Sequence, residues 1–289
     1  MKQTQTGAPT SAQSTYLFDQ ESTVELVRLM NQDRFITRAL GGALVKWPDL
    51  PEEANILDVA CGPGGWVLDV AYALPDVAVC GVDISSTMIE YANARARSQN
   101  ITNASFGVMD ITHPLDFASG SFDLIHARFL TAVLKQEAWI PFLTECTRLL
   151  RLGGFLQLVE GDDAGRSLSP ALERLNGLGM QALRLAGYGF SPDGRTFGVF
   201  PGLLRLLKQA GYQDLRLSTT TLDHSLASKG WADYFRNQEF LLHEIKPLLL
   251  ITGLITEEEF EVLFQQAMID MQQDDFAAVG QIMSLWGRK

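Results

Sequence analysis

The sequence is poor in cysteine, histidine and basic residues, and it lacks a long apolar run. Only 23 lysines and arginines stand against 34 aspartates and glutamates, which gives a formal net charge of -11. Such a charge disfavours broad contact with nucleic-acid phosphates or anionic membranes. The longest strongly apolar stretch of the C-terminal region, 248–251, is far shorter than the roughly 20 residues of a membrane-spanning helix. We therefore expect neither a nucleic-acid partner nor membrane insertion.

The scarce cysteines and histidines argue against two further kinds of site. Cys61, Cys80 and Cys146 are an odd number and lie within apparent core elements, so they suit reduced thiols rather than a disulfide framework. Three of the four histidines lack the spaced cysteine, histidine or acidic partners that a metal site needs. We expect a cytoplasmic protein without a bound metal.

The chain has the pattern of an α/β protein. With 289 residues, of which 46% are hydrophobic, it can bury a sizeable core. From residue 55 onward, apolar runs typical of strands alternate with segments of helical periodicity, which predicts a parallel sheet covered by helices. The expected strands are 55–60, 77–83, 104–109, 122–127 and 154–160, and the expected helices are 65–73, 86–98 and 137–150.

The most informative run, 56–66, is a buried strand that turns through glycines into a helix. Gly62 and Gly64 let the chain bend tightly and bring bare backbone against a ligand. The next strand ends in Asp83, about 20 residues later, where a carboxylate could accept hydrogen bonds from ribose hydroxyls. No lysine follows the glycines, which excludes a P-loop. A dinucleotide fingerprint is nearly matched, but Ala60 replaces its first glycine and a proline stiffens the loop, so NAD(P) stays an alternative ligand.

The segments around the alternating core have other patterns. Ser22 and Glu25 have the spacing of a helix capping box, and Pro48 would end the helix that they begin, so we expect a helix over 21–47. After residue 161, helical sequence interrupted by glycines predicts a cap above the sheet, with a helix at 172–185 and a loop at 187–201. The sheet is expected to continue with a sixth strand beginning at 215 and a last strand at 276–286. The expected parts are a disordered tail at 1–15, an N-terminal helical cap at 16–48, a cofactor-binding Rossmann-like core at 49–162, a helical lid at 163–201, and the end of the sheet at 202–289 with inserted lid helices at 228–272.

Five motifs, taken in order, resemble those of the class I S-adenosylmethionine-dependent methyltransferases. The likeness is to the small-molecule branch, which includes the ubiquinone and menaquinone biosynthesis methyltransferases. It implies a doubly wound, seven-stranded, mostly parallel sheet with an antiparallel last strand. Leu152 departs from the family, which usually has proline there, at a position that shapes a turn. The motifs are Asp58–Gly64, Gly81–Ser85, Met109–Asp110, Ser121–Arg128 and Leu149–Gly154.

The resemblance implies S-adenosyl-L-methionine as the cofactor and assigns its parts to residues. Asp83 would bind both ribose hydroxyls, Asp110 the adenine amino group, and Asp58 would help to fix the amino-acid end. Related enzymes often fold an N-terminal helix over the cofactor, so Arg28 could hold the methionyl carboxylate. Each role has a structural alternative, since Asp110 could cap a loop and Arg28 could be a solvated surface side chain. The other candidates are Tyr16 and Gln32 from the N-terminal segment, the backbone of Ala60, Gly62, Gly64, Ile111 and Ala127, the neighbouring Arg128, and Ile84 and Met88 against the adenine.

The implied chemistry asks little of the protein beyond alignment. Methyl transfer from a sulfonium is an in-line displacement on an activated electrophile, so the protein mainly positions the acceptor and excludes water. If the acceptor is a hydroxyl or an amine, the candidate bases are His126 after the fourth strand and Glu160 or Asp162 after the fifth, because strand ends open onto the ligand crevice.

The lid favours a small, largely apolar methyl acceptor, such as a quinone or a natural-product intermediate. Two alternatives stay open: an NAD(P)-dependent oxidoreductase, and a methyltransferase-fold protein that uses its cofactor site for another reaction or for regulation. Seven aromatic residues could line the acceptor pocket or only pack the lid against the sheet: Tyr188, Phe190, Phe197, Phe200, Trp231, Tyr234 and Phe235.

Overall fold

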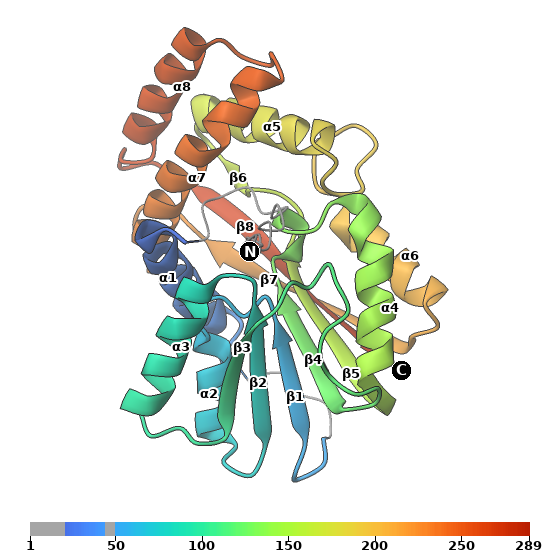
Figure 1. The fold of residues 1–289 in the computed structure, drawn as a ribbon. Coiled ribbons are helices and arrows are strands. Elements are labelled where there is room, and N and C mark those ends of the chain that lie inside the picture. Colours follow the sequence, from blue (N-terminus) through green and yellow to red (C-terminus); the bar gives the residue numbers. More distant parts are fainter. Residues whose placement is uncertain (1–20, 44–49) are drawn as a thin grey trace, which may run out of the picture.

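An eight-stranded sheet runs through the lower part of the molecule, with a group of helices above one end of it (Figure 1). The structure is a computed structural model that describes residues 21–43 and 50–289. The expected tail at 1–15, Tyr16 and Pro48 therefore lie outside the described residues. The strands are β1 (Asn55–Val59), β2 (Ala78–Asp83), β3 (Ala104–Val108), β4 (Phe122–Arg128), β5 (Leu150–Gly161), β6 (Arg166–Ser167), β7 (Gln213–Asp223) and β8 (Ala278–Arg288).

The topology confirms the expected Rossmann-like α/β fold. The order β3-β2-β1-β4-β5 is parallel throughout, and β8 lies antiparallel between β5 and β7. The strand count of seven was wrong by one, because β6 also pairs with β8. The pairing of β5 with β8 ends at Ile282 of β8. Strand β6 pairs with the next part of β8, at Val279 and Ala278. It extends the line of β5 past a break at 162–165, and so short a strand leaves no periodic signal in the sequence.

Helices cover both faces of the sheet, because alternate residues of each strand point to opposite sides. Leu57 and Ile125 pack on the side of α4 and α6, whereas Ile56 and Leu124 pack on the side of α2. The helices are α1 (Thr23–Ala39), α2 (Gly65–Ala73), α3 (Ser86–Ser98), α4 (Trp139–Leu149), α5 (Pro170–Leu185), α6 (Val199–Gln209), α7 (Trp231–Ile251) and α8 (Glu257–Asp270), with short 3-10 turns η1 (Leu130–Ala132) and η2 (Gln136–Ala138).

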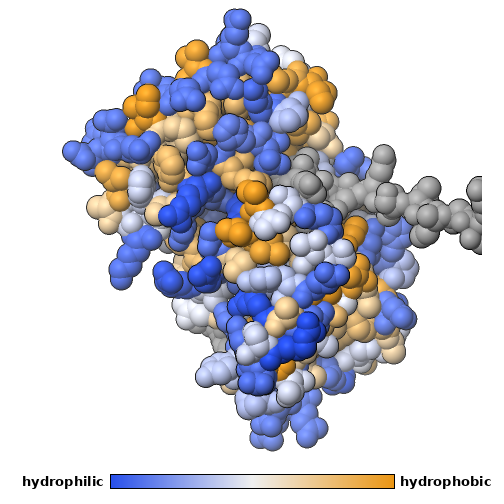
Figure 2. Space-filling view, turned by 60° about the vertical axis from the view of Figure 1, so that its left-hand side comes forward, coloured by the Kyte–Doolittle hydropathy of each residue, from blue (hydrophilic) through white to orange (hydrophobic). Residues whose placement is uncertain are grey.

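Helices α5, α7 and α8 pack on one another above the carboxyl ends of the parallel strands (Figure 1). Their shared core includes Leu172 and Leu175 of α5, Leu242 of α7, and Phe260 and Phe264 of α8. We refer to α5, α7 and α8 as the lid. Figure 2 shows hydrophobic residues at the junction of the lid and the sheet, with mostly hydrophilic residues around them.

Several element boundaries differ from those expected, and the end of the N-terminal helix differs most. Ser22 does cap α1, accepting a hydrogen bond from the Val24 amide, but the helix ends at Ala39 and not at 47. Gly41 and Gly42 follow with positive φ angles of 91° and 122°, a conformation that ends a helix and that glycine adopts without strain. The expected loop at 187–201 is also shorter, because α6 begins at 199 and takes a proline into its first turn, where no backbone N–H is needed.

Candidate active site

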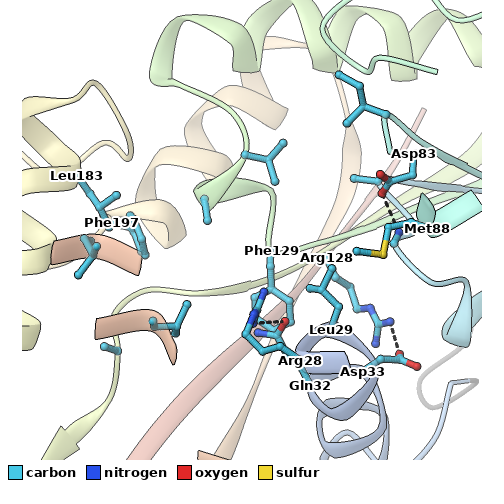
Figure 3. A pocket seen from close by; sticks show the side chains of 18 of the residues that line it. Arg28, Leu29, Gln32, Asp33, Asp83, Met88, Arg128, Phe129, Leu183 and Phe197 are labelled. Atoms are coloured by element: carbon cyan, nitrogen blue, oxygen red, sulfur yellow. Dashed lines mark hydrogen bonds and ion pairs between the residues drawn. The ribbon is translucent and has the colours of Figure 1, made fainter. Parts of the chain in front are cut away.

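A cavity of about 340 Å³ lies between the carboxyl ends of β1, β2 and β4 and the lid. Ten of the residues expected to bind the cofactor line it, together with side chains of α5 and α7. Figure 3 shows Asp83 and Met88 on one side of this space, and Leu183 and Phe197 on the other. The expected residues that line the cavity are Arg28, Gln32, Ala60, Gly62, Asp83, Ile84, Met88, Asp110, Ile111 and Arg128.

The glycine turn brings backbone to the edge of this cavity. Gly62 has φ +53°, and Gly64 has φ +73° and precedes α2. A Cβ atom on Gly64 would lie 2.5 Å from the ring of Phe106, so only glycine fits there. The amide of Cys61 donates to the Val82 carbonyl, which ties the turn to β2. The backbone near Gly62 thus faces the cavity without a side chain between it and a ligand.

Asp83 is held in place at the end of β2 by two backbone amides. Its Oδ2 atom accepts a hydrogen bond from Gly62 at 2.8 Å, and its Oδ1 atom accepts one from Ser85 at 3.0 Å. Burial raises the pKa of Asp83, while these two amides act in the opposite direction. A carboxylate offers about four acceptor positions, so it can still accept from two hydroxyls of a ligand in the cavity.

The side of the cavity beyond Asp83 can hold a flat apolar group. Met88 is buried on α3 and lines the cavity with Ile84 and Ile111. Asp110 lines it too, but its Oδ1 atom accepts from the amide and the hydroxyl of Thr112, and its Oδ2 atom bonds His113 at 3.1 Å. The loop-capping alternative for Asp110 therefore has a structural basis, alongside its place at the cavity.

Helix α1 supplies two charged clusters to the wall. The guanidinium of Arg28 bonds both oxygens of the buried Glu25 at 2.7 Å, and it also donates to Gln32 and to Asn237 of α7. Arg28 is thus a paired side chain between α1 and the lid, and a cofactor carboxylate would have to share it with Glu25.

Arg128, at the end of β4, donates to Asp33 of α1 (Figure 3). It also donates to Thr37 of the same helix. Asp33 was not expected at the site. It lines the cavity, and a Cβ on Gly65 would lie 1.8 Å from its carboxylate. Asp33 lies one helical turn after Leu29, which also lines the cavity, so the same face of α1 supplies both side chains.

His126 and Asp58 lie outside the cavity. They are neighbours in the parallel pairing of β1 and β4, and both side chains point to the α2 face of the sheet. His126 donates from Nδ1 to Asp58 at 2.8 Å, its ring stacks on Trp66 with 3.7 Å between centroids, and burial lowers its pKa. The structure therefore gives His126 a packing role, buried and away from the cavity that Asp83 lines. Ala127 is also buried, on the opposite face, and does not line the cavity.

Glu160 lines a second cavity of about 530 Å³, between α1, α7 and the ends of β5, β7 and β8. Its carboxyl group is buried and accepts from the Leu130 amide at 2.8 Å and from the amide and hydroxyl of Thr131 at 3.3 and 2.8 Å. Burial raises the pKa of Glu160 to about 7. The geometry makes Glu160 the group that holds η1, the turn that follows β4.

Asp162, the third candidate base, caps a helix. Its Oδ1 atom accepts from the Val199 amide at 2.7 Å, in the first turn of α6, where the N-cap residue Gly198 has no side chain to do so. We expect Asp162→Ala to lower the free energy of unfolding by about 1 kcal/mol, the usual loss for a cap, and Asp162→Asn to lose less. Urea denaturation of the two variants measures this, and equal losses would contradict the assignment.

Most of the aromatic candidates pack the protein and do not line the first cavity. Phe197 alone of the seven lines it, and Tyr234 lines the second. Phe190 and Phe200 pack against the sheet core, and Trp231 and Phe235 against the lid core. Aliphatic side chains of α5 and α7 supply the apolar wall instead.

The region that contains the glycine turn resembles a known protein family. Residues 56–154 match the family model described as a methyltransferase domain. These residues form a methyltransferase domain. The resemblance indicated by the five motifs is thereby confirmed. Within the described residues, no helix is long and apolar enough to cross a membrane, and no group of three or more His, Cys, Asp or Glu residues is arranged to hold a metal ion.

Relatives of the methyltransferase domain are named as methyltransferases. The N-methyltransferase verN of Clonostachys rogersoniana is 30% identical over 154 residues, which are 52% of this chain and 51% of that protein. The demethylmenaquinone methyltransferase of Lactococcus lactis is 30% identical over 107 residues, 37% of this chain and 41% of that protein. The chain thus spans about half the length of the curated relatives that it matches.

The solved structure of the YcgJ protein from Bacillus subtilis has the same fold. It is 17% identical, with a TM-score of 0.57, and the match covers 87% of this chain and 98% of that one. The matched methyltransferase domain holds Asp83 and Asp110, whereas α1 and the lid lie outside residues 56–154. The half of the cavity formed by the lid is therefore the part that the family model does not describe.

Proposed function

We propose that the protein is an S-adenosyl-L-methionine-dependent methyltransferase that acts on a small, largely apolar metabolite. The observation that carries the proposal is Asp83, a carboxyl group fixed by Gly62 and Ser85, in a cavity that continues into the apolar lid. A ribose diol beside a carboxylate, with backbone close by, is the arrangement that the methyltransferase domain would need for this cofactor.

The cofactor's parts would have different partners. The two ribose hydroxyls would donate to Asp83, and the adenine would lie between Ile84 and Met88 with its amino group near Asp110. The positively charged methionyl ammonium would lie toward Asp33, and the carboxylate toward Arg28. The bound cofactor would supply an activated methyl group.

The residues around the cavity would then align the acceptor and exclude water. An in-line displacement needs the acceptor atom opposite the departing sulfur, at about 3 to 3.5 Å from the methyl carbon. Neither His126 nor Glu160 lines the first cavity. This supports a mechanism in which positioning carries most of the rate enhancement, with Glu160 acting on the loop after β4 and not on the acceptor.

The remaining parts of the proposal concern partners and compartment. A net charge of -11 supports a small-molecule acceptor and not a nucleic acid. Cys61, Cys80 and Cys146 are free thiols, which supports a reducing cytoplasm. The verN and demethylmenaquinone methyltransferase relatives support natural products or quinones as the acceptor class.

Isothermal titration tests the cofactor directly. We expect saturable binding of S-adenosylmethionine and of S-adenosylhomocysteine, and no heat with NAD or NADP at the same concentrations. Transfer of a labelled methyl group to a panel of apolar phenols, quinols and cyclic amides then tests the reaction. Binding of NAD without binding of S-adenosylhomocysteine would turn the assignment to an oxidoreductase. Cofactor binding without transfer across the panel would favour a non-methylating use of the site.

A further inference from the structure

The lid end of the first cavity is apolar except for two carboxamides. One face of α5 and one face of α7 form it, and their residues recur at helical spacing, with Asn176 and Gln238 as the polar exceptions. Gly179 leaves open space on this face, because a Cβ there would meet only Ile245, at 3.5 Å. The full set is Leu175, Asn176, Gly179, Met180 and Leu183 of α5, and Gln238, Leu241, Leu242 and Ile245 of α7.

Asn176 differs from Gln238 in having an unused donor. The Nε2 atom of Gln238 donates to the Ala164 carbonyl at 3.3 Å. Asn176 is only 8% exposed, and its Nδ2 atom is buried with no hydrogen-bond partner. Burying an amide without a partner destabilises a protein, so such groups in the interior of a fold are rare. An oxygen of a bound molecule would supply the missing partner.

The charges around the cavity favour a neutral ligand at this end. The two cationic side chains on the wall, Arg28 and Arg128, are paired with Glu25 and Asp33. Asp83 and Asp110 lie at the opposite end, near the glycine turn. The one acidic residue nearer the lid, Asp163, lies 3.1 Å from Arg166 and accepts a hydrogen bond from Gly165. No charged side chain of α5 or α7 lines the cavity within the part of the chain that the structure describes.

We propose that Asn176 determines acceptor specificity by donating a hydrogen bond to a carbonyl oxygen of a neutral, otherwise apolar acceptor. This inference rests on the proposed function, because it places the methyl acceptor at the lid end of the cofactor cavity. The methylene and ring atoms of the acceptor would pack against Leu175, Leu183 and Leu242, and Gly179 leaves room for its skeleton beside the carboxamide.

A pair of probes that differ by one carbonyl tests the proposal. Binding of 1-tetralone and of tetralin to the protein saturated with S-adenosylhomocysteine can be measured by ligand-observed NMR for the wild type and for Asn176→Leu. The quantity compared is the ratio of the two affinities in the wild type and in the variant. The difference in hydrophobicity between the probes contributes to both ratios and cancels in this comparison. We expect this ratio to shift toward tetralin by about 10-fold in the variant, the usual effect of losing one hydrogen bond. An unchanged ratio, or no binding of either probe, would overturn the proposal.

The matched control is Gln181→Leu, which removes a carboxamide from an exposed position of the same helix. It should leave the ratio of the two affinities unchanged. The melting temperature separates ligand recognition from a structural role: Asn176→Leu should raise it by about 2–4 °C, because an unpaired buried amide is replaced by an apolar group of similar size. A lower melting temperature would mean that Asn176 supports the fold. Binding of S-adenosylhomocysteine in the same samples tests the proposed function separately.

Discussion

Replacing Asp83 by alanine is expected to weaken the binding of S-adenosylhomocysteine by about 100-fold, because two hydrogen bonds to a charged acceptor are lost together. The change also leaves the amides of Gly62 and Ser85 without the carboxylate that now fixes them. The turn would therefore lose part of its fixed geometry as well as its ligand contact. Isothermal titration of the wild type and of Asp83→Ala measures the difference in affinity.

Two further variants make this measurement specific. Asp76→Ala removes a carboxylate from an exposed turn just before β2 and should leave the affinity unchanged. Asp83→Asn keeps one acceptor oxygen and should lose less than the alanine variant. If Asp83→Ala stayed folded and bound S-adenosylhomocysteine as tightly as the wild type, the ribose would not lie at Asp83.

The second large effect expected is a pH dependence of stability that comes from Glu160. Burial raises the pKa of Glu160 in the folded protein to about 7, from 4.5 for the same group in the unfolded chain. The folded state thus binds the proton more tightly, so the contribution of Glu160 to stability is fully present below pH 4.5 and is lost as the pH rises through 7. Relative to Glu160→Gln, the wild type should lose up to about 3 kcal/mol of unfolding free energy between pH 4.5 and pH 8.

Urea denaturation of both proteins at several pH values measures this loss. The comparison with Glu160→Gln cancels the titration of all other groups, because glutamine does not titrate. Its amide nitrogen cannot accept from the Leu130 or Thr131 amide, but this loss is the same at every pH and leaves the slope unchanged. Glu258→Gln, at an exposed position of α8, serves as the control and should follow the wild type at every pH. A parallel pH dependence of wild type and Glu160→Gln would mean that Glu160 is ionised throughout this range.

The parts of the fold that could be predicted are those that local sequence determines. Helices α2 and α3 have the bounds expected from the sequence, since each follows a buried strand and begins at a glycine turn or at a serine N-cap. The end of α1 was misplaced because proline at 48 is an obvious helix breaker, whereas the glycine pair at 41 and 42 ends the helix first.

The site could be predicted best where backbone motifs form it. Asp83 and Gly62 belong to such motifs, and both line the cavity. His126 was expected at the ligand crevice and lies outside the first cavity, because a single sequence does not reveal which face of β4 an alternating residue occupies. Asn176 had one usable signal, because it is a polar residue on the apolar face of an amphipathic helix. The sequence does not show which helix faces it, since α7, across the cavity, is more than 50 residues away in the chain.

The two cavities share part of their walls, including Arg28, Phe129, Phe197 and Gln238. A residue that lines both cavities lies between them, so the partition at these positions is one residue thick. Side chains change rotamer far faster than helices move. A molecule too long for the first cavity could thus extend into the second when one of these side chains turns. The length of ligand that the protein admits would then depend on rotamers at the partition while the backbone stays in place.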